Sequence, residues 1–240
     1  MNTGGDGRLA LREALSRDAR REALMASRLF RLLPAKELES VLDHAVMRRY
    51  ARNELVMRKA DPGTGMALIV TGRVRIGSTA IDGREVSLGV LGPGEVLGEI
   101  SLLDGEARSA DVIALDDCVM ITVDRESFLR LLRGNAELCL SLMGYLCERL
   151  RRTNMSMEEL ALLGLPERLG GLLLRLARDY GRPVAAGTRI ELKLSQKDLS
   201  TLIGASREKV NRQLRAWEAD GVISIDAGRV VLQQPERLGS

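Results

Sequence analysis

The sequence predicts an α+β fold with a strand-rich N-terminal half, a long helix and a helical C-terminal domain. Three observations support this prediction. Short apolar segments divided by glycine turns fill residues 54–123, helical spacing runs from about 126 to 163, and two short helices joined by a glycine turn follow at 195–219. With 240 residues the chain is long enough for two modest domains.

The composition is that of a globular protein. Apolar residues make up 45% of the chain and charged residues 29%, while aromatic residues are only 2%, so the cores must be aliphatic. The net charge is +3 with a pI near 8.9, which permits contact with a polyanion without arguing for it.

The cysteine count and the apolar runs set the expected compartment. Three cysteines, Cys118, Cys139 and Cys147, are too few for a disulfide framework or a four-ligand metal site, which favours a reducing cytoplasm. No stretch approaches the roughly 20 apolar residues of a membrane span, and the N-terminus lacks the apolar centre of a signal peptide. We therefore expect a soluble cytoplasmic protein that contacts no membrane.

The N-terminal half begins with helical spacing from Met25 to Leu42, in which Pro34 opens a second short helix. The charged residues before it predict a loosely held extension over 1–25. The strand segments that follow are "ELVM", "MALIV", "RVRI", "EVSLGVL", "EVLGEI", "DVIAL" and "CVMITV". Asp82-Gly83 predicts a hairpin, and Gly92-Pro93-Gly94 a turn. Many short strands with frequent turns indicate a sandwich, roll or barrel.

Two of these segments alternate apolar and polar residues, which predicts half-buried strands. They are Val74 with Ile76, and Val86 with Leu88 and Val90.

The long helical stretch carries a heptad seam. Its members are Met143, Leu146, Leu150, Thr153, Met157 and Leu160, at alternating spacings of three and four. This pattern favours a coiled coil between two copies, and the alternative is a helix packed on its own domain. Thr153 is the polar member, and it needs a partner such as its twin, a water or a ligand. Gly164, as a C-terminal cap, and Pro166, in the next helical turn, predict a hinge.

The segment "SQKDLSTLIGASREKVNRQLRAWEADGVI" has the signals of a helix-turn-helix. Ser195 and Asp198 form a capping box, Gly204 permits the tight turn, and Ser206 is a good N-cap for the second helix. The first helix buries Leu199, Leu202 and Ile203, and the second buries Val210, Leu214 and Trp217.

The opposite face of the second helix presents four polar residues, Arg207, Glu208, Asn211 and Arg212. Arginine can pair with guanine and glutamate can accept from cytosine, so this face suits the reading of DNA bases. Phosphate contacts are expected from Gln196, Lys197, Ser206 and Lys209. The hairpin "VISIDAGRVVL", with Arg229 beside its turn, would be a wing. The alternative is a solvated charged helix in an ordinary bundle.

Residues 98–110, "GEISLLDGEARSA", have the elements of an anion cradle. Gly98 allows close backbone approach, Arg108 supplies a cation and Ser109 a hydroxyl, while Glu99 adds an acceptor suited to a sugar hydroxyl. The alternative is an ordinary surface arginine after a turn.

Three segments in order, "GEVLGEISLLDGEARSADV", "RRTNM" and "SREKVNR", resemble the cyclic AMP receptor protein and fumarate-nitrate regulator family of bacterial transcription factors. The resemblance covers about residues 28–233. It implies homodimers with an N-terminal β-roll that binds a cyclic nucleotide, a long dimerisation helix and a C-terminal winged helix-turn-helix. It also implies RNA polymerase as a partner, together with double-stranded DNA.

The resemblance implies domain bounds of 1–25 for the extension, 26–137 for the roll, 138–164 for the dimerisation helix and hinge, and 165–240 for the DNA-binding domain. It also implies the ligand roles. Gly98 and Ser109 would bind phosphate oxygens, Arg108 would neutralise the phosphate, and Glu99 would hold the ribose 2′-hydroxyl. Thr153 from one subunit and Asn154 from the other would contact the base.

The family's best-known member has serine where this chain has Asn154. The resemblance implies cyclic AMP as the favoured ligand. Because asparagine is both donor and acceptor, the preference for adenine is less secure, and cyclic GMP is the rival. We expect a population shift by the ligand, no enzymatic activity, and TGTGA-like half-sites in a two-fold symmetric operator. No metal or haem is expected, since the N-terminus lacks a cysteine cluster and His44 is the only histidine. A nucleotide-independent DNA binder is the alternative.

Overall fold

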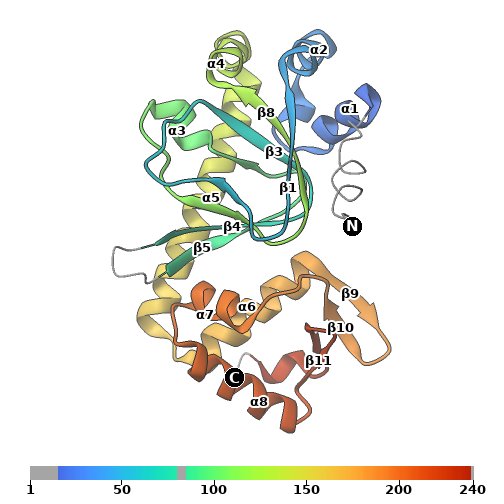
Figure 1. The fold of residues 1–240 in the computed structure, drawn as a ribbon, viewed down its shortest axis with the longest axis vertical. Helices are drawn as coiled ribbons and strands as arrows, with labels where there is room; N and C mark the ends of the chain where they lie inside the picture. Colours follow the sequence, from blue (N-terminus) through green and yellow to red (C-terminus); the bar gives the residue numbers. More distant parts are fainter. Residues whose placement is uncertain (1–15, 80–84, 239–240) are drawn as a thin grey trace, which may run out of the picture. The chain divides into compact units, whose positions relative to one another are not determined.

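Figure 1 shows the computed structural model of the chain, which describes residues 16–79 and 85–238. The chain divides into two compact units. The first comprises the residues up to Gly77 together with Val90–Arg149, and the second comprises Ser78–Gly89 together with Leu150–Ser240. The hairpin turn predicted at Asp82-Gly83 lies outside the described residues.

Two four-stranded sheets form the N-terminal half, in the orders β1-β8-β3-β6 and β2-β7-β4-β5. The strands are β1 (Val46–Tyr50), β2 (Leu55–Met57), β3 (Gly65–Thr71), β4 (Val74–Thr79), β5 (Glu85–Leu91), β6 (Val96–Leu97), β7 (Asp111–Ala114) and β8 (Cys118–Asp124). Figure 1 shows these strands wrapping into a roll. Neighbouring strands pair antiparallel, and the predicted α+β fold with an N-terminal β-roll is confirmed.

Strand β3 is buried on both faces. Ala67 and Ile69 point into the core between the two sheets, while Met66 and Leu68 point into a second core beneath the helices. Because successive side chains of a strand point to opposite faces, a continuous apolar run is what such a strand requires. The segment "MALIV" therefore shows no alternation.

The helices of the first unit are α1 (Arg17–Ala26), α2 (Ala35–His44), α3 (Glu99–Asp104), α4 (Arg125–Gly134) and the first part of α5 (Ala136–Leu162), with a 3₁₀ turn, η2, at Phe30–Leu32. Within the helix-covered core, the rings of Phe30 and Phe128 pack edge to face, with their centroids 6.0 Å apart. The predicted extension over 1–25 is wrong for its last part, since α1 begins at Arg17 and its Leu24 is fully buried.

The helical stretch predicted over about 126–163 is broken at Asn135, which has extended backbone between α4 and α5. The side-chain Oδ1 of Asn135 accepts from the backbone N–H of Leu138 at 2.9 Å, so the residue caps the start of α5. Asparagine competes for backbone hydrogen bonds in this way, which explains the break.

The strands differ from the prediction in three places. β1 was not predicted, because "VMRRY" carries two arginines in a short run. The segment "EVLGEI" ends as a strand at Leu97, since Gly98 adopts a left-handed conformation (φ 81°) and opens α3. Val86 and Leu88 alternate as expected, yet they are the exposed residues of β5, an edge strand.

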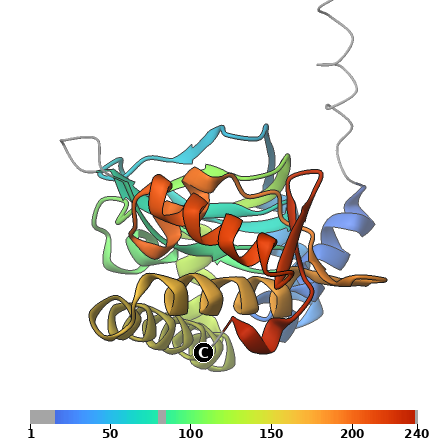
Figure 2. The same ribbon diagram turned by 90° about the horizontal axis from the view of Figure 1, so that it is seen from below.

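In the second unit α6 (Leu165–Tyr180), α7 (Gln196–Ile203) and α8 (Arg207–Ala219) accompany the last part of α5. A sheet in the order β11-β12-β10-β9 completes it, formed by β9 (Gly181–Val184), β10 (Gly187–Ile190), β11 (Ile223–Asp226) and β12 (Arg229–Leu232), and a 3₁₀ turn, η3, lies at Pro235–Arg237. The hairpin β9–β10 was not predicted, and it extends away from α6, α7 and α8 (Figures 1 and 2).

Gly164 is the N-cap of α6 with extended backbone, not the left-handed cap expected at the end of the preceding helix. Pro166 lies in the first turn of α6, as predicted. None of the described helices is both long and apolar enough to cross a membrane.

Candidate functional site

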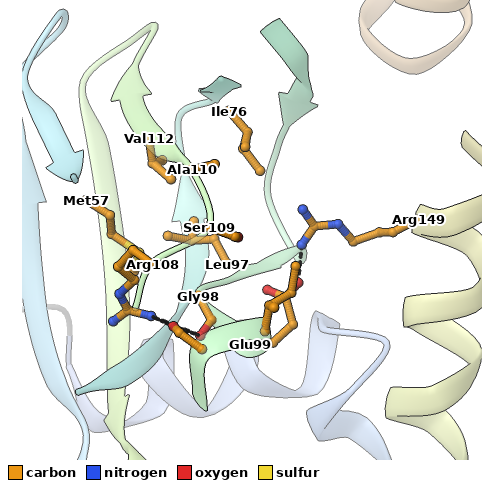
Figure 3. A pocket seen from close by; sticks show the side chains of 12 residues that line it. Met57, Ile76, Leu97, Gly98, Glu99, Arg108, Ser109, Ala110, Val112 and Arg149 are labelled. Carbon is orange, nitrogen blue, oxygen red and sulfur yellow. Dashed lines mark hydrogen bonds and ion pairs between the residues drawn. The ribbon is translucent and has the colours of Figure 1, made fainter. Parts of the chain in front are cut away.

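A pocket in the first unit is built around the loop between β6 and β7. It is lined by Met57, Ile76, Leu97, Gly98, Glu99, Ile100, Ser101, Arg108, Ser109, Ala110, Val112 and Arg149 (Figure 3). The empty space inside it is about 330 Å³, part of which is open solvent. Apolar side chains from the strands form one wall, and charged side chains from α3, the loop and α5 form the other.

Gly98, Glu99, Arg108 and Ser109 were predicted from the sequence and meet in this pocket. Gly98 has positive φ and begins the turn into α3, where a β-carbon would collide with the Arg108 guanidinium. Ser109 is exposed at the mouth of the pocket. The loop conformation thus depends on glycine at position 98.

Arg108 is held by the loop itself. Its Nη1 donates to the backbone oxygen of Gly98 at 2.9 Å and to Ser101 Oγ at 2.8 Å, and its Nη2 donates to the backbone oxygen of Gly65 at 2.6 Å. These bonds use three of the five N–H donors of a guanidinium and leave two for an anion. Burial lowers the pKa of Arg108, and the charge of Glu99 opposes that shift.

Glu99 is completely buried. One carboxylate oxygen, Oε1, accepts from Arg149 Nη1, while Oε2 is buried without a hydrogen-bond partner. Burial raises the pKa of Glu99, and the charge of Arg149 partly opposes the rise. A buried, unpaired carboxylate oxygen is costly, so this atom marks a place where a donor from a ligand would be stabilising.

Arg149 was missed in the sequence. It reaches from α5 to Glu99 (Figure 3), and its guanidinium lies 6.0 Å from the ring centre of Tyr145, one turn earlier on the helix. The Tyr145 hydroxyl donates to the backbone oxygen of Val96 at 2.8 Å, and burial raises the pKa of that hydroxyl. Arg149 precedes Thr153 by four residues, so both lie on one face of α5, which was a usable signal.

Thr153 and Asn154 are exposed on α5 in the second unit, and neither lines the pocket. Their role as base contacts stays a prediction. Most of the predicted seam is also exposed on this chain, with Leu150 at 61% and Met157 at 64%, whereas Leu146 packs partly against the core. Exposed apolar stripes often contact another molecule, and the dimer seam stays a prediction.

The helix-turn-helix is formed by α7 and α8. Ser195 and Asp198 make the predicted capping box, Gly204 has φ 62° in the turn, and the Ser206 hydroxyl accepts from the Lys209 N–H at 3.4 Å. Val210, Leu214 and Trp217 are buried as predicted, and Leu202 is half-buried.

Arg207, Glu208, Lys209 and Arg212 are exposed on α8, whereas Asn211 is half-buried and accepts a hydrogen bond from Gln196. In the expected wing, the Nε of Arg229 lies 3.3 Å from the Oε2 of Glu191. Glu191 also forms an ion pair with Arg189. The face that the sequence predicted for DNA is therefore present on α8.

Within residues 16–79 and 85–238, histidine, cysteine and acidic side chains form no group of three or more that could hold a metal ion. His44 ends α2, and its Nδ1 lies 2.8 Å from the backbone oxygen of Ser40.

Comparison with known proteins agrees with these features. The family model of the cyclic nucleotide-binding domain matches residues 47–135, and that of the Crp-like helix-turn-helix domain matches residues 167–240. The chain is 31% identical over 189 residues to the CRP-like cAMP-activated global transcriptional regulator of Mycobacterium tuberculosis, covering 79% of this chain and 84% of the relative.

It is 31% identical over 211 residues to the cyclic AMP receptor protein of Thermus thermophilus, covering 88% of this chain and 94% of the relative. Among solved structures, the c-di-GMP responsive global regulator CLP of Xanthomonas campestris is similar at a TM-score of 0.73 and 29% identity, with 83% of this chain and 99% of that chain covered. The chain belongs to the cyclic AMP receptor protein and fumarate-nitrate regulator family, whose members are DNA-binding transcription regulators and not enzymes.

Proposed function

We propose that this protein is a homodimeric transcription regulator whose DNA binding depends on a cyclic nucleotide, with cyclic AMP as the ligand. The observation that carries the proposal is the unpaired oxygen of Glu99, buried at a pocket that also presents a partly engaged arginine. A sugar hydroxyl and a phosphate on one small molecule satisfy both groups.

In this proposal Glu99 Oε2 accepts from the ribose 2′-hydroxyl, while the two remaining donors of Arg108 bind the cyclic phosphate together with the Gly98 backbone and Ser109. Charge-assisted hydrogen bonds of this kind are roughly twice as strong as neutral ones. The apolar wall of Ile76, Leu97 and Val112 packs against the sugar and base.

The dimer forms along the exposed stripe of α5, where Leu150 and Met157 bury against a second copy. Thr153, one turn after Arg149 on α5, supplies the first base contact in this proposal, as the resemblance of this segment implies. Asn154 of the other subunit supplies the second base contact. The nucleotide then stabilises one arrangement of the two helices by differential binding.

The two α8 helices enter successive major grooves roughly 34 Å apart, so the operator has two-fold symmetry. Arg207, Glu208 and Arg212 read half-sites similar to TGTGA. RNA polymerase is the partner that we expect at promoters, and the cytoplasm the compartment.

Three alternatives remain within this fold. Asn154 can donate or accept, which keeps cyclic GMP in consideration. The similarity to a regulator described as responsive to c-di-GMP adds that dinucleotide. A regulator that binds DNA without any nucleotide is the third.

Calorimetry with cyclic AMP, cyclic GMP and cyclic di-GMP tests the proposal on wild type and on Arg108→Ala. We expect tightest binding of cyclic AMP and loss of binding in the variant, which should still unfold cooperatively in the absence of ligand although it loses the three loop hydrogen bonds of Arg108. Unchanged affinity of Arg108→Ala would remove Arg108 from the site. Operator binding by fluorescence anisotropy, with and without the best ligand, separates the nucleotide-independent alternative.

A further inference from the structure

A side-chain amide pair joins the two helices of the helix-turn-helix. Gln196, the first residue of α7, donates from Nε2 to Oδ1 of Asn211 on α8 at 2.8 Å. The two residues are 15 positions apart and are both half-buried. Asn211 lies one turn after Arg207 and directly before Arg212, between two residues assigned to base reading.

The pair is held in a rigid frame. The capping box fixes the backbone immediately before Gln196, and the left-handed Gly204 with the Ser206 cap fixes the entry into α8. Leu199 of α7 and Val210 of α8 are both buried. The relative position of the two amides is therefore set by packing, not by the amides alone.

One amide–amide hydrogen bond uses one N–H and one carbonyl and leaves the other ends available. Here these ends are the Nδ2 of Asn211 and the Oε1 of Gln196. In the described part of the chain neither atom makes a further hydrogen bond, and neither is a buried atom without a partner. If both amides were rotated, the pair would still present one donor and one acceptor.

In the major groove adenine presents an acceptor, N7, beside a donor, the N6 amino group. A neighbouring donor and acceptor on the protein match that edge. Guanine presents two acceptors, cytosine only a donor and thymine only an acceptor, so each satisfies one half of the pair.

We propose that Gln196 and Asn211 act together to select adenine at the base pair that Asn211 faces. Asn211 contacts the base, and Gln196 both fixes the orientation of its amide and offers the second contact. This assignment rests on the proposed function as a DNA-binding regulator, and it replaces the phosphate contact that the sequence predicted for Gln196. It adds one read position to those of Arg207, Glu208 and Arg212.

The experiment is selection from a DNA library with randomised half-sites, using the full-length protein with its nucleotide and sequencing of the bound fraction. For wild type we expect a preference for adenine of about tenfold or more at one position, because each good bidentate pair contributes a discrimination of about 1–3 kcal/mol. Asn211→Ala should reduce the preference at that position to about onefold and leave the other positions unchanged.

Gln196→Glu is the sharper variant, because a carboxylate can only accept. Asn211 must then turn its Nδ2 toward Glu and present its oxygen outward, so the pair offers two acceptors. The preferred base at that position should change from adenine to cytosine, whose amino group donates. A purely structural role for Gln196 would weaken all sequences without changing the base.

Gln213→Glu, at a half-buried glutamine of α8 outside the pair, is the control for the added charge, and it should lower binding to all sequences alike. Melting temperatures check that each variant is folded. An unchanged profile in Asn211→Ala, or no change of base in Gln196→Glu, overturns this inference alone. If wild type selects no sequence at all, the proposed function fails and the inference fails with it.

Discussion

Arg149 on α5 forms an ion pair with Glu99, the first residue of α3, although 50 positions separate them in the sequence. The carboxylate is fully buried and the guanidinium is only partly exposed. This pair links the long helix directly to the loop that holds Arg108, so a ligand that contacts Glu99 also acts on α5. The contribution of this ion pair can be measured from the free energy of unfolding and from its dependence on pH.

Removing the cation should be costly. Arg149→Met removes the ion-pair partner of the buried Glu99 carboxylate, and we expect a loss of about 3 kcal/mol in urea unfolding, at the low end for breaking a buried pair. The double variant Glu99→Gln with Arg149→Met should lose distinctly less, because it has no charge to bury. Equal losses in the two variants would contradict the ion pair as the source.

The pH dependence has a definite sign. Because burial raises the pKa of Glu99 in the folded chain, the folded state binds the proton more tightly than the unfolded state does. The stability contribution is fully present below the unfolded pKa, near 4.3, and is lost as pH rises through the raised folded pKa. Urea unfolding from pH 4 to 7 measures the free energy of unfolding of wild type and of Glu99→Gln. The difference between the two should fall as the pH rises, and a difference that does not change with pH would exclude a raised pKa of Glu99.

Comparing alanine substitutions at two glycines distinguishes the cost of backbone strain from an effect on ligand binding. Gly98 and Gly105 have φ 81° and 80°, so alanine at either position should cost about 1–2 kcal/mol in thermal unfolding. Only at Gly98 does the new β-carbon collide with the Arg108 guanidinium, since at Gly105 the nearest atom is 3.4 Å away. Cyclic AMP affinity in calorimetry should therefore fall about tenfold or more in Gly98→Ala only, corresponding to at least about 1.4 kcal/mol. Similar affinities in both variants would argue against this contact.

The seam can be tested with two exposed apolar residues of α5. Leu150 lies on the heptad pattern and Met155 lies off it, at 61% and 54% exposure. Sedimentation should show Leu150→Gln dissociating at concentrations where wild type is dimeric, because a polar side chain is buried at the interface without a partner. Met155→Gln should remain dimeric. Dissociation of both variants would place the interface elsewhere.

Base and phosphate contacts should differ in their response to sequence. Arg212→Ala should cost about 1–3 kcal/mol at one base pair and relax specificity there, whereas Lys209→Ala should weaken all sequences alike and lower the salt slope by about 1. Anisotropy titrations on operator variants at several salt concentrations measure both effects. A uniform loss in Arg212→Ala would reassign it to the phosphate backbone.

Much of the DNA-binding unit could be predicted, because its signals are local. The capping box at Ser195, the left-handed turn at Gly204 and the cap at Ser206 each act within four residues. The β9–β10 hairpin was missed because "GRPVAAGTRI" has little apolar alternation, and β10 also pairs with β12, which lies about 40 residues further along the chain.

The pocket was also predictable only in part from the sequence. Gly98, Glu99, Arg108 and Ser109 could be identified because they lie within a dozen residues and a glycine marks the turn. Sequence could not show that three donors of Arg108 are already bound to Gly98, Ser101 and Gly65, since Gly65 is 43 positions away.

The sequence by itself determined the order of strands, long helix and helix-turn-helix, and the chemical types at the pocket and on α8, because periodicity, caps and turns depend on neighbouring residues. Only the tertiary structure decided that Glu99 is buried with one oxygen unpaired, that Arg149 is its partner, and that Gln196 is bonded to Asn211. Those relationships depend on burial and on contacts between distant segments, and their free energies exist only once the chain has packed.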